Sequence, residues 1–207
     1  GPVLSPDGNI LVGTNDGRVF VVTPSDSVSI APLVSAACDT LLAGTTPVTT
    51  EVSGNLAVGR FHGAGGYSIA YATRDGYLRV VDEPGKGLGA IDVVWRAVSG
   101  VPDFAPSLLG VDLDREPDRD LELIVVDSSR GMVHAFDLTG AELRGWPVSV
   151  AGTLGAAAVG DLDGDGFPEV MAIDDQGSLH RWNRNGVESL GWPVSLASRY
   201  SAGSGAG

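Results

Sequence analysis

The stretch VMAIDDQGSLHRW, residues 170 to 182, decides how this chain folds. It consists of an apolar segment, a polar turn that closes on Gly177, and a second segment in which apolar and polar residues alternate. Alternation with a period of two is typical of a β-strand, and glycine readily adopts the positive φ that a tight turn requires. The stretch therefore predicts a β-hairpin.

The same pattern occurs three more times along the chain. The copies are ILVGTNDGRVFVV (10 to 22), IAYATRDGYLRVV (69 to 81) and LIVVDSSRGMVHAF (123 to 136). The turn glycines Gly17, Gly76, Gly131 and Gly177 are 59, 55 and 46 residues apart. This period is that of a β-propeller blade and is longer than an ankyrin or leucine-rich unit.

Other short segments recur around the hairpins. A strand-like segment precedes three of them, as NLAVGRF (55 to 61), SLLGVDLD (107 to 114) and AAAVGDLD (156 to 163). A second turn follows three of them, as DEPG (82 to 85), DLTG (137 to 140) and NRNG (183 to 186). The repeating unit is therefore expected to contain about four short strands.

These repeats predict an all-β fold, because no window of ten or more residues keeps the 3.6-residue apolar stripe of a helix. We expect a β-propeller of about four four-stranded antiparallel blades, which stack around an axis. The blades are expected at approximately 1–50, 51–104, 105–152 and 153–200, with 201–207 as a tail or the start of a further blade. Two small β-sandwiches are the alternative, but they do not predict the same turn chemistry four times.

The composition excludes several classes of function. The net charge is −13, and Lys86 is the only lysine among the 13 basic residues, so a nucleic-acid partner is not expected. The longest apolar runs are far shorter than the roughly 20 residues of a membrane span, so membrane insertion is not expected. The single cysteine, Cys38, forms no intramolecular disulfide and supports no multi-cysteine zinc site.

An acidic loop in AVGDLDGDGFPEVMAIDDQG, residues 158 to 177, predicts a calcium site. Calcium takes six to eight oxygen ligands, and Asp161, Asp163 and Asp165 can converge on one ion if the chain curls at its glycines. The carbonyl of Phe167 and the carboxylate of Glu169 would complete the shell. A solvated acidic turn is the alternative.

An EF-hand also begins with this pattern of aspartates and glycine, but it requires a glutamate at position twelve of the loop. Position twelve is Ala172, inside an apolar segment, so the EF-hand interpretation fails.

The stretch DLDREPDRDLEL, residues 112 to 123, stands at the matching place in the third repeat. Alignment of Glu122 with Glu169 leaves two extra residues. Asp112 and Asp114 keep their positions, Glu116 or Asp118 takes the third carboxylate position, and Asp120 falls at the backbone-carbonyl position. Arg115, Pro117 and Arg119 could distort this second predicted calcium site or neutralise it through salt bridges.

The first two repeats are not expected to bind calcium. In the second, the four carboxylate positions are occupied by Arg60, His62, Ala64 and Ser68. In the first, the corresponding stretch is SPDGN (5 to 9), which also lacks the acidic pattern.

The stretch AVGDLDGDGFPEVMAIDDQGSLHRWNRNGVESLGWPV resembles the FG-GAP (integrin α-like, VCBS-type) β-propeller repeat. The resemblance covers residues 105 to 196 well, residues 55 to 100 in outline and residues 1 to 24 by pattern, where the opening is closer to a quinoprotein-like blade. It implies structural calcium held by Asp161, Asp163, Asp165, Phe167 and Glu169. It also implies an extracellular or cell-surface location, expected to be bacterial.

The resemblance further implies a module for ligand binding, adhesion or scaffolding, whose partner is a protein or a carbohydrate bound by loops on one rim. Integrin-type propellers have seven blades. We therefore expect either part of a larger propeller or one that a second chain completes, rather than a closed four-bladed disc.

Nothing in the sequence predicts an enzyme, because the motifs of common nucleophiles, zinc proteases and phosphate-binding loops are absent. His134 and His180 occupy the same repeat position, which favours exposed strand positions over catalytic ones. Trp95, Trp146 and Trp192 also recur, and contacts between blades are favoured over a sugar-stacking platform. The alternatives are a propeller enzyme of the quinoprotein dehydrogenase or polysaccharide lyase type, and a structural protein that self-associates by pairing blades between chains.

Overall fold

The computed structural model describes residues 1–15, 18–22, 34–35, 52–61, 67–73, 77–82, 91–96, 107–115, 120–137 and 139–196. These residues form four antiparallel four-stranded sheets, which we call blades 1 to 4 in chain order. In each blade the strands are hydrogen-bonded in the order in which they occur in the chain. The all-β prediction and the four four-stranded units are confirmed.

The strands have the following bounds. Blade 1 contains β1 (Val3–Leu4), β2 (Ile10–Gly13), β3 (Arg18–Val22) and β4 (Val34–Ser35). Blade 2 contains β5 (Val52–Gly59), β6 (Ser68–Thr73), β7 (Tyr77–Asp82) and β8 (Ile91–Arg96). Blade 3 contains β9 (Ser107–Val111), β10 (Glu122–Asp127), β11 (Met132–Phe136) and β12 (Val148–Ser149). Blade 4 contains β13 (Leu154–Gly160), β14 (Glu169–Asp174), β15 (Ser178–Trp182) and β16 (Val194–Ser195).

The four predicted hairpins form the two central strands of the four blades. The 3-10 turn η2 (Ser128–Arg130) lies between β10 and β11 and ends at Gly131. Gly131 and Gly177 both have positive φ, of 62° and 76°, as the turn pattern predicts. The second turns also form where they are described, because Gly140 donates to the Asp137 carbonyl and Gly186 to that of Asn183.

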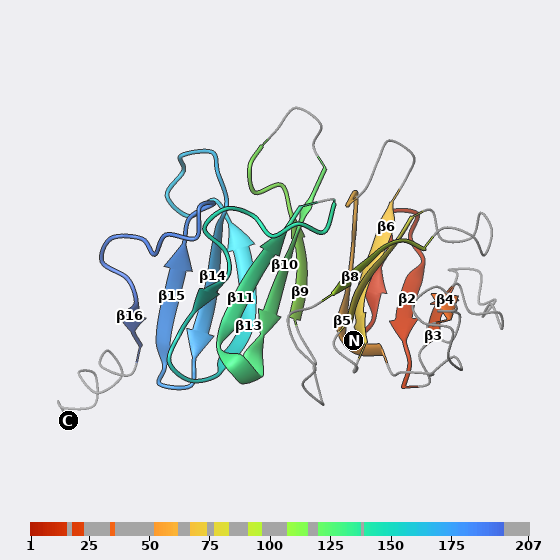
Figure 1. Ribbon diagram of the computed structural model, residues 1–207, viewed down its shortest axis with the longest axis horizontal. Coiled ribbons are helices and arrows are strands. Elements are labelled where there is room, and N and C mark those ends of the chain that lie inside the picture. Colours follow the sequence, from red (N-terminus) through yellow and green to blue (C-terminus); the bar gives the residue numbers. More distant parts are fainter. Residues whose placement is uncertain are drawn as a thin grey trace, which may run out of the picture.

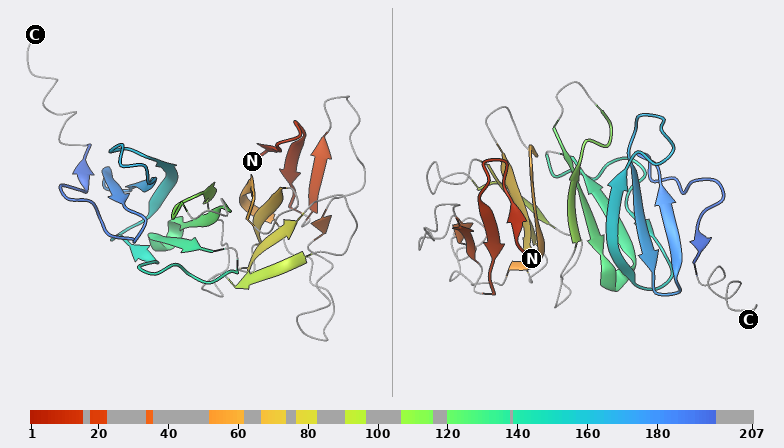
Figure 2. Two further views of the ribbon diagram at one scale, coloured as in Figure 1. Left: turned by 90° about the horizontal axis from the view of Figure 1, so that it is seen from above. Right: turned by 180° about the vertical axis from the view of Figure 1, so that it is seen from behind.

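The blades follow one another along an open arc, with blade 1 and blade 4 at its two ends (Figure 2). The first strands of successive blades, β5, β9 and β13, contact one another. The last strands β8 and β16 lie toward the outside of the arc (Figure 2). In Figure 1 the loops that join the first and second strands of blades 3 and 4 project from the same rim.

The hydrophobic core lies between the blades, because each blade is apolar on both faces. In blade 3 the face toward blade 4 carries four residues with no exposed surface: Ile124, Val126, Val133 and Ala135. Its face toward blade 2 carries three apolar residues that are at most 5% exposed: Leu123, Val125 and Phe136. Full burial of an aliphatic or aromatic side chain contributes roughly 1.5 to 3 kcal/mol, so these contacts dominate the stability of the arc.

The same rule holds at all three blade interfaces. We call the face that contacts the following blade the next-blade face, and the opposite one the previous-blade face. The next-blade face of blade 1 carries Leu11, Val19 and Val21, which pack against Ile69 and Tyr71 of blade 2. The next-blade face of blade 2 carries Ala70, Ala72, Leu78 and Val80, which pack against blade 3.

Among the described residues, we find no helix with the length and apolar character needed to cross a bilayer.

Candidate metal centre

The acidic loop of blade 4 connects the end of β13 with the start of β14, and Gly160 pairs with Glu169 across its base. One carboxylate oxygen each of Asp161, Asp163 and Glu169 lies within 4.8 Å of the others. Asp161 accepts hydrogen bonds from the backbone N–H of Gly164 at 2.7 Å and of Gly166 at 3.0 Å. Both glycines have positive φ, so the loop curls as the sequence predicts.

The other two predicted ligands of this loop are not in the carboxylate group. The Asp165 carboxylate accepts a hydrogen bond from the backbone N–H of Phe167 at 2.8 Å. The Phe167 ring lies 4.0 Å below the guanidinium carbon of Arg184. Ligation by Asp165 and by the Phe167 carbonyl stays a prediction.

Arg181 on β15 supplies positive charge to the same loop. Its guanidinium forms ion pairs with Asp163 and with Glu169, the latter at 3.2 Å. Burial alone would lower the pKa of Arg181, but the hydrogen bonds and charges of Asp163 and Glu169 outweigh burial and raise it. A side chain of the protein therefore already neutralises part of the predicted calcium site.

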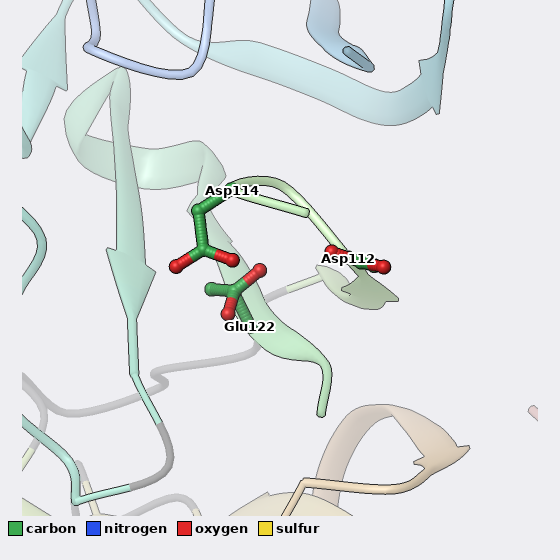
Figure 3. A group of neighbouring side chains, drawn as sticks. All are labelled: Asp112, Asp114 and Glu122. Carbon is green, nitrogen blue, oxygen red and sulfur yellow. The ribbon is translucent and has the colours of Figure 1, made fainter. Parts of the chain in front are cut away.

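Blade 3 builds the same arrangement with a different sequence (Figure 3). One carboxylate oxygen each of Asp112, Asp114 and Glu122 lies within 4.8 Å of the others. In Figure 3 the carboxylates of Asp114 and Glu122 point toward each other, and Asp112 lies beside them on the same loop. Asp112 accepts a hydrogen bond from the backbone N–H of Arg115, as Asp161 does from that of Gly164.

The two loops also share the contact that holds their glutamate. Glu122 accepts a hydrogen bond from the backbone N–H of Leu113 at 2.6 Å, and Glu169 accepts one from that of Leu162 at 2.8 Å. Arg115 has a φ of 56°, so it adopts the left-handed conformation that Gly164 adopts in blade 4. The loop therefore keeps its curl without a glycine at that position.

The charge balance differs between the two loops. Ala135 stands in blade 3 where Arg181 stands in blade 4, so no guanidinium comes from that position. Glu122 is only 7% exposed, and burial raises the pKa of its carboxyl to about 7. The hydrogen bond from Leu113 opposes this increase, whereas the negative charges of Asp114 and Asp112 add to it.

The remaining predicted ligands of blade 3 lie elsewhere. The Asp120 carboxylate forms an ion pair at 3.2 Å with Arg60, which follows β5 in blade 2. The backbone N–H of Leu121 also donates to the Arg60 carbonyl. Asp118, with Glu116, Pro117 and Arg119, lies outside the described residues, as do His62 and Ala64 of blade 2.

The structure resembles solved structures of low sequence identity. It superposes on BBS1N in complex with ARL6DN with a TM-score of 0.57 and 17% identity, covering 94% of this chain and 55% of that one. It superposes on virginiamycin B lyase from Staphylococcus aureus with a TM-score of 0.59 and 11% identity, covering 95% and 55%. For BamB from Moraxella catarrhalis the TM-score is 0.58 and the identity 16%, covering 93% and 47%.

All three neighbours are β-propeller proteins. The fold is a β-propeller. This chain spans about half the length of each neighbour. No family model and no curated protein sequence matches the chain, so the resemblance of the propeller blades to the FG-GAP repeat stays a prediction.

Two histidines of the propeller correct an expectation from the sequence. His134 and His180 are 4% and 8% exposed, so the predicted exposed strand position is wrong. Both lie on a previous-blade face, where alternation along the strand directs them toward the preceding blade. The polarity of histidine suggests an exposed side chain. Here each histidine is buried instead, because an acidic side chain of its own blade satisfies its polar ring.

Each histidine is held in the same way. The Nδ1 of His134 lies 2.7 Å from Glu142, and that of His180 lies 2.7 Å from Glu188. His180 also stacks on Trp182, with ring centroids 5.3 Å apart. The glutamate that stands eight residues after each histidine is the sequence signal for this pair, and it was not recognised.

Asp174 joins the same group in blade 4. Its carboxylate lies 3.2 Å from the Nε2 of His180 and accepts the backbone N–H groups of Gln176 and Ser178. Burial alone would raise the pKa of Asp174, but the hydrogen bonds from Ser178, His180 and Gln176 outweigh burial and lower it. The group therefore fixes the β14–β15 turn.

Trp146 connects two blades, as the interpretation from the repeat predicts. It is 7% exposed, and its indole N–H donates to the Arg184 carbonyl of blade 4 at 3.1 Å. Its counterpart Trp192 is half-buried. The side chain of Trp95 lies outside the described residues.

Proposed function

We propose that this propeller is a calcium-stabilised, non-catalytic module that binds a protein or carbohydrate ligand outside the cell. The observation that carries the proposal is the repetition of one carboxylate group in blades 3 and 4. Two loops of different length and sequence gather two aspartates and one buried glutamate with matching backbone hydrogen bonds.

The donor set fits calcium. Calcium is a hard cation that binds carboxylate oxygens, and Asp112, Asp114 and Glu122 would hold it in blade 3. Asp161, Asp163 and Glu169 would hold it in blade 4, with Asp165 and the Phe167 carbonyl as further ligands. The ion supplies two positive charges to loops whose carboxylates otherwise repel one another.

A weak site suits a location outside the cell. Calcium sites of extracellular modules have dissociation constants on the order of 10⁻⁴ to 10⁻³ M. Such sites stabilise the folded chain by mass action wherever the ion is abundant. This argument supports the extracellular or cell-surface location that the resemblance implies, whereas the proposed bacterial source rests on the resemblance alone.

A protein partner is favoured by one of the solved neighbours. BBS1N is a propeller in complex with ARL6DN, so this fold presents surfaces suited to protein binding. The enzyme alternative has a neighbour too, since virginiamycin B lyase shares the fold. Absorbance of a bound quinone, or turnover of acidic glycans, would establish the enzyme and overturn the non-catalytic assignment.

A thermal melt with calcium or with a chelator tests the metal proposal. At a calcium concentration of about 100 times the dissociation constant, we expect each occupied site to stabilise the folded chain by about 2.7 kcal/mol, or roughly 5 to 10 °C in Tm. The double variants Asp112→Asn with Asp114→Asn, and Asp161→Asn with Asp163→Asn, should each remove part of this shift.

Asp7→Asn is the matched control, because Asp7 lies in the corresponding loop of blade 1, where no calcium is expected. It should leave the calcium-dependent shift intact. Equal Tm values in calcium and chelator for the unaltered chain would refute the proposal.

A further inference from the structure

The residues that lead into β10 contact blade 2 and the blade 3 carboxylate group within three consecutive positions. Asp120 forms an ion pair at 3.2 Å with Arg60 of blade 2. The backbone N–H of Leu121 donates to the Arg60 carbonyl at 2.6 Å. Glu122 follows directly, and its carboxylate belongs to the group drawn in Figure 3. The place of Glu122 is therefore tied to a contact between two blades.

The side chain of Leu121 is seated in a notch between the two blades. Gly59 of β5 and Gly110 of β9 form this notch, because neither residue has a side chain that would fill it. A Cβ on Gly59 would overlap Cδ1 of Leu121, and a Cβ on Gly110 would lie 3.2 Å from the same atom. Leu121 also packs against the hydrophobic core between blades 2 and 3, which contains Phe61. Both the backbone and the side chain thus hold Leu121 against blade 2.

Alternation along the chain links this seat to the orientation of Glu122. Leu121 packs against the same core as Leu123 and Val125, on the face of blade 3 that contacts blade 2. Successive side chains of an extended chain point to opposite faces. A Leu121 that is seated against blade 2 therefore directs Glu122 to the opposite side, where the carboxylates gather. Displacement of Leu121 would move the carboxylate of the next residue with it.

The blade 4 loop cannot form the same two bonds with blade 3. Phe167 and Pro168 stand at the positions of Asp120 and Leu121. Pro168 has no backbone N–H to donate. Phe167 has no charge, and its ring lies against Arg184 of its own blade. The anchorage on the preceding blade is thus a property of the blade 3 loop that the blade 4 loop does not share.

The length of the blade 3 loop gives this anchorage a purpose. The loop comprises residues 112–121, whereas that of blade 4 comprises residues 161–168 and is two residues shorter. Ordering of a longer loop around an ion costs more conformational entropy. Fixing its last two residues on blade 2 lowers that cost before the ion binds, and such preorganisation increases affinity.

We propose that blade 2 sets the calcium affinity of the blade 3 site, with Leu121 as the residue that positions Glu122 for the ion. The inference rests on the proposed function, because it concerns the calcium that the blade 3 carboxylates would hold. Calcium binds those molecules in which Leu121 is seated in the notch. The apparent affinity is therefore proportional to the fraction of molecules with a seated Leu121.

Gly59→Val tests the proposal, because a valine there would fill the notch and displace Leu121 without a change in charge. Val111 occupies the same repeat position in blade 3, so the strand accepts valine there. Asp161→Asn with Asp163→Asn removes two ligands of the blade 4 loop and gives a background in which blade 3 is measured alone. In calorimetric titrations of the folded chain, we expect Gly59→Val to lower the calcium affinity roughly fivefold or more.

Gly160→Val in the same background is the matched control. Gly160 stands in blade 4 at the repeat position of Gly59, and a Cβ there would meet no atom of the described residues within 4 Å. The calcium affinity of blade 3 should stay unchanged. An equal loss of affinity in Gly160→Val and Gly59→Val would overturn the assignment to the notch.

Leu121→Ala separates positioning from a merely structural role. Loss of packing should lower the Tm in chelator in either case, but only a positioning role also lowers the calcium affinity of the folded chain. Gly59→Val should then cost little further affinity in the Leu121→Ala chain, because the atom that the valine displaces is gone. Additive losses, or an unchanged affinity in Leu121→Ala, would overturn the proposal.

The titrations also separate this inference from the proposed function. Calcium binding with equal affinity in the background chain and in Gly59→Val would overturn the role of blade 2 and leave the calcium site of blade 3 in place. No calcium binding by the background chain would remove the blade 3 site itself, and this inference with it.

Discussion

The guanidinium of Arg181 lies 3.2 Å from the carboxylate of Glu169, inside the acidic loop where the sequence predicts calcium. Arg181 also pairs with Asp163, so one fixed charge contacts two of the three grouped carboxylates. A calcium ion that used both carboxylates would have to compete with this side chain. In blade 3, Ala135 stands at the position of Arg181. Only the blade 4 loop therefore has an arginine at this position that would compete with calcium for the carboxylates.

Replacement of this competitor should strengthen calcium binding in blade 4. With Arg181→Ala we expect the calcium affinity of the blade 4 loop to rise by roughly five- to tenfold, because a partly exposed ion pair no longer opposes the ion. Without calcium the variant should melt at a lower temperature, since Asp163 and Glu169 lose their countercharge. Calcium titration at constant ionic strength measures the first effect.

Arg144→Ala is the control for the removal of one positive charge, because Arg144 is exposed on blade 3. It should change the calcium affinity of the blade 4 loop only slightly. An unchanged affinity in Arg181→Ala would show that the arginine and the ion do not share these ligands.

The calcium affinity of blade 3 should depend on pH through Glu122. Burial raises the pKa of this carboxyl from 4.5 to about 7, so the folded chain holds the proton more tightly than the unfolded chain does. In chelator, this group therefore lowers stability as pH rises from about 4.5 to about 7. Calcium must displace the same proton, so its affinity should fall as pH drops below about 7.

Melting curves between pH 5 and pH 8 measure both effects of Glu122. The glutamine of Glu122→Gln does not titrate. In chelator, the variant should therefore not show the loss of stability between about pH 4.5 and about pH 7 that Glu122 causes. A wild-type chain and a Glu122→Gln chain with the same pH profile would contradict the raised pKa.

Gly145 should not tolerate a side chain. Its φ is 94°, and a Cβ would overlap the carbonyl oxygen of Asn185 in blade 4. We expect Gly145→Ala to cost at least about 3 kcal/mol, because the left-handed backbone and the contact between blades both oppose it. Chemical denaturation measures this change in the free energy of unfolding.

Gly191 is the matched control, because it has a φ of 85° at the same repeat position but nothing within 4 Å of a Cβ. Gly191→Ala should cost only about 1 to 2 kcal/mol, because the left-handed backbone alone opposes it. Equal costs for the two variants would show that the Gly145 contact with blade 4 contributes nothing.

The fold followed from the sequence because its signal is local and repeated. Each hairpin combines alternation with a glycine turn, and four copies at a common period restrict the architecture to stacked sheets. The positive φ of Gly164 and Gly166 was predictable for the same reason, since both glycines lie within a loop that must curl.

The candidate site was predictable only in part. Asp161, Asp163 and Glu169 come together as the spacing suggests, but the Asp165 carboxylate is not part of this group. Arg181 lies on β15, outside the acidic loop, so the loop sequence alone does not predict its ion pairs with Asp163 and Glu169. Its signal was an arginine at a repeat position that Val80 and Ala135 fill with small apolar side chains.

Contacts between blades were the least predictable, because they join residues that are distant in the chain. The bond from the Trp146 indole to the Arg184 carbonyl requires two blades in register. The ion pair between Arg60 and Asp120 requires the same.

The ion pair between Arg60 and Asp120 involves the blade 2 loop, which lacks the acidic pattern of blades 3 and 4. Arg60 stands where the loops of blades 3 and 4 begin with an aspartate, and it reaches across to Asp120 of the neighbouring sheet. The guanidinium of Arg60 is a covalently attached positive charge, so its presence does not depend on the calcium concentration of the medium. The ion pair between blades 2 and 3 is therefore insensitive to chelators. The acidic loops of blades 3 and 4, in contrast, would respond to the calcium concentration of the medium.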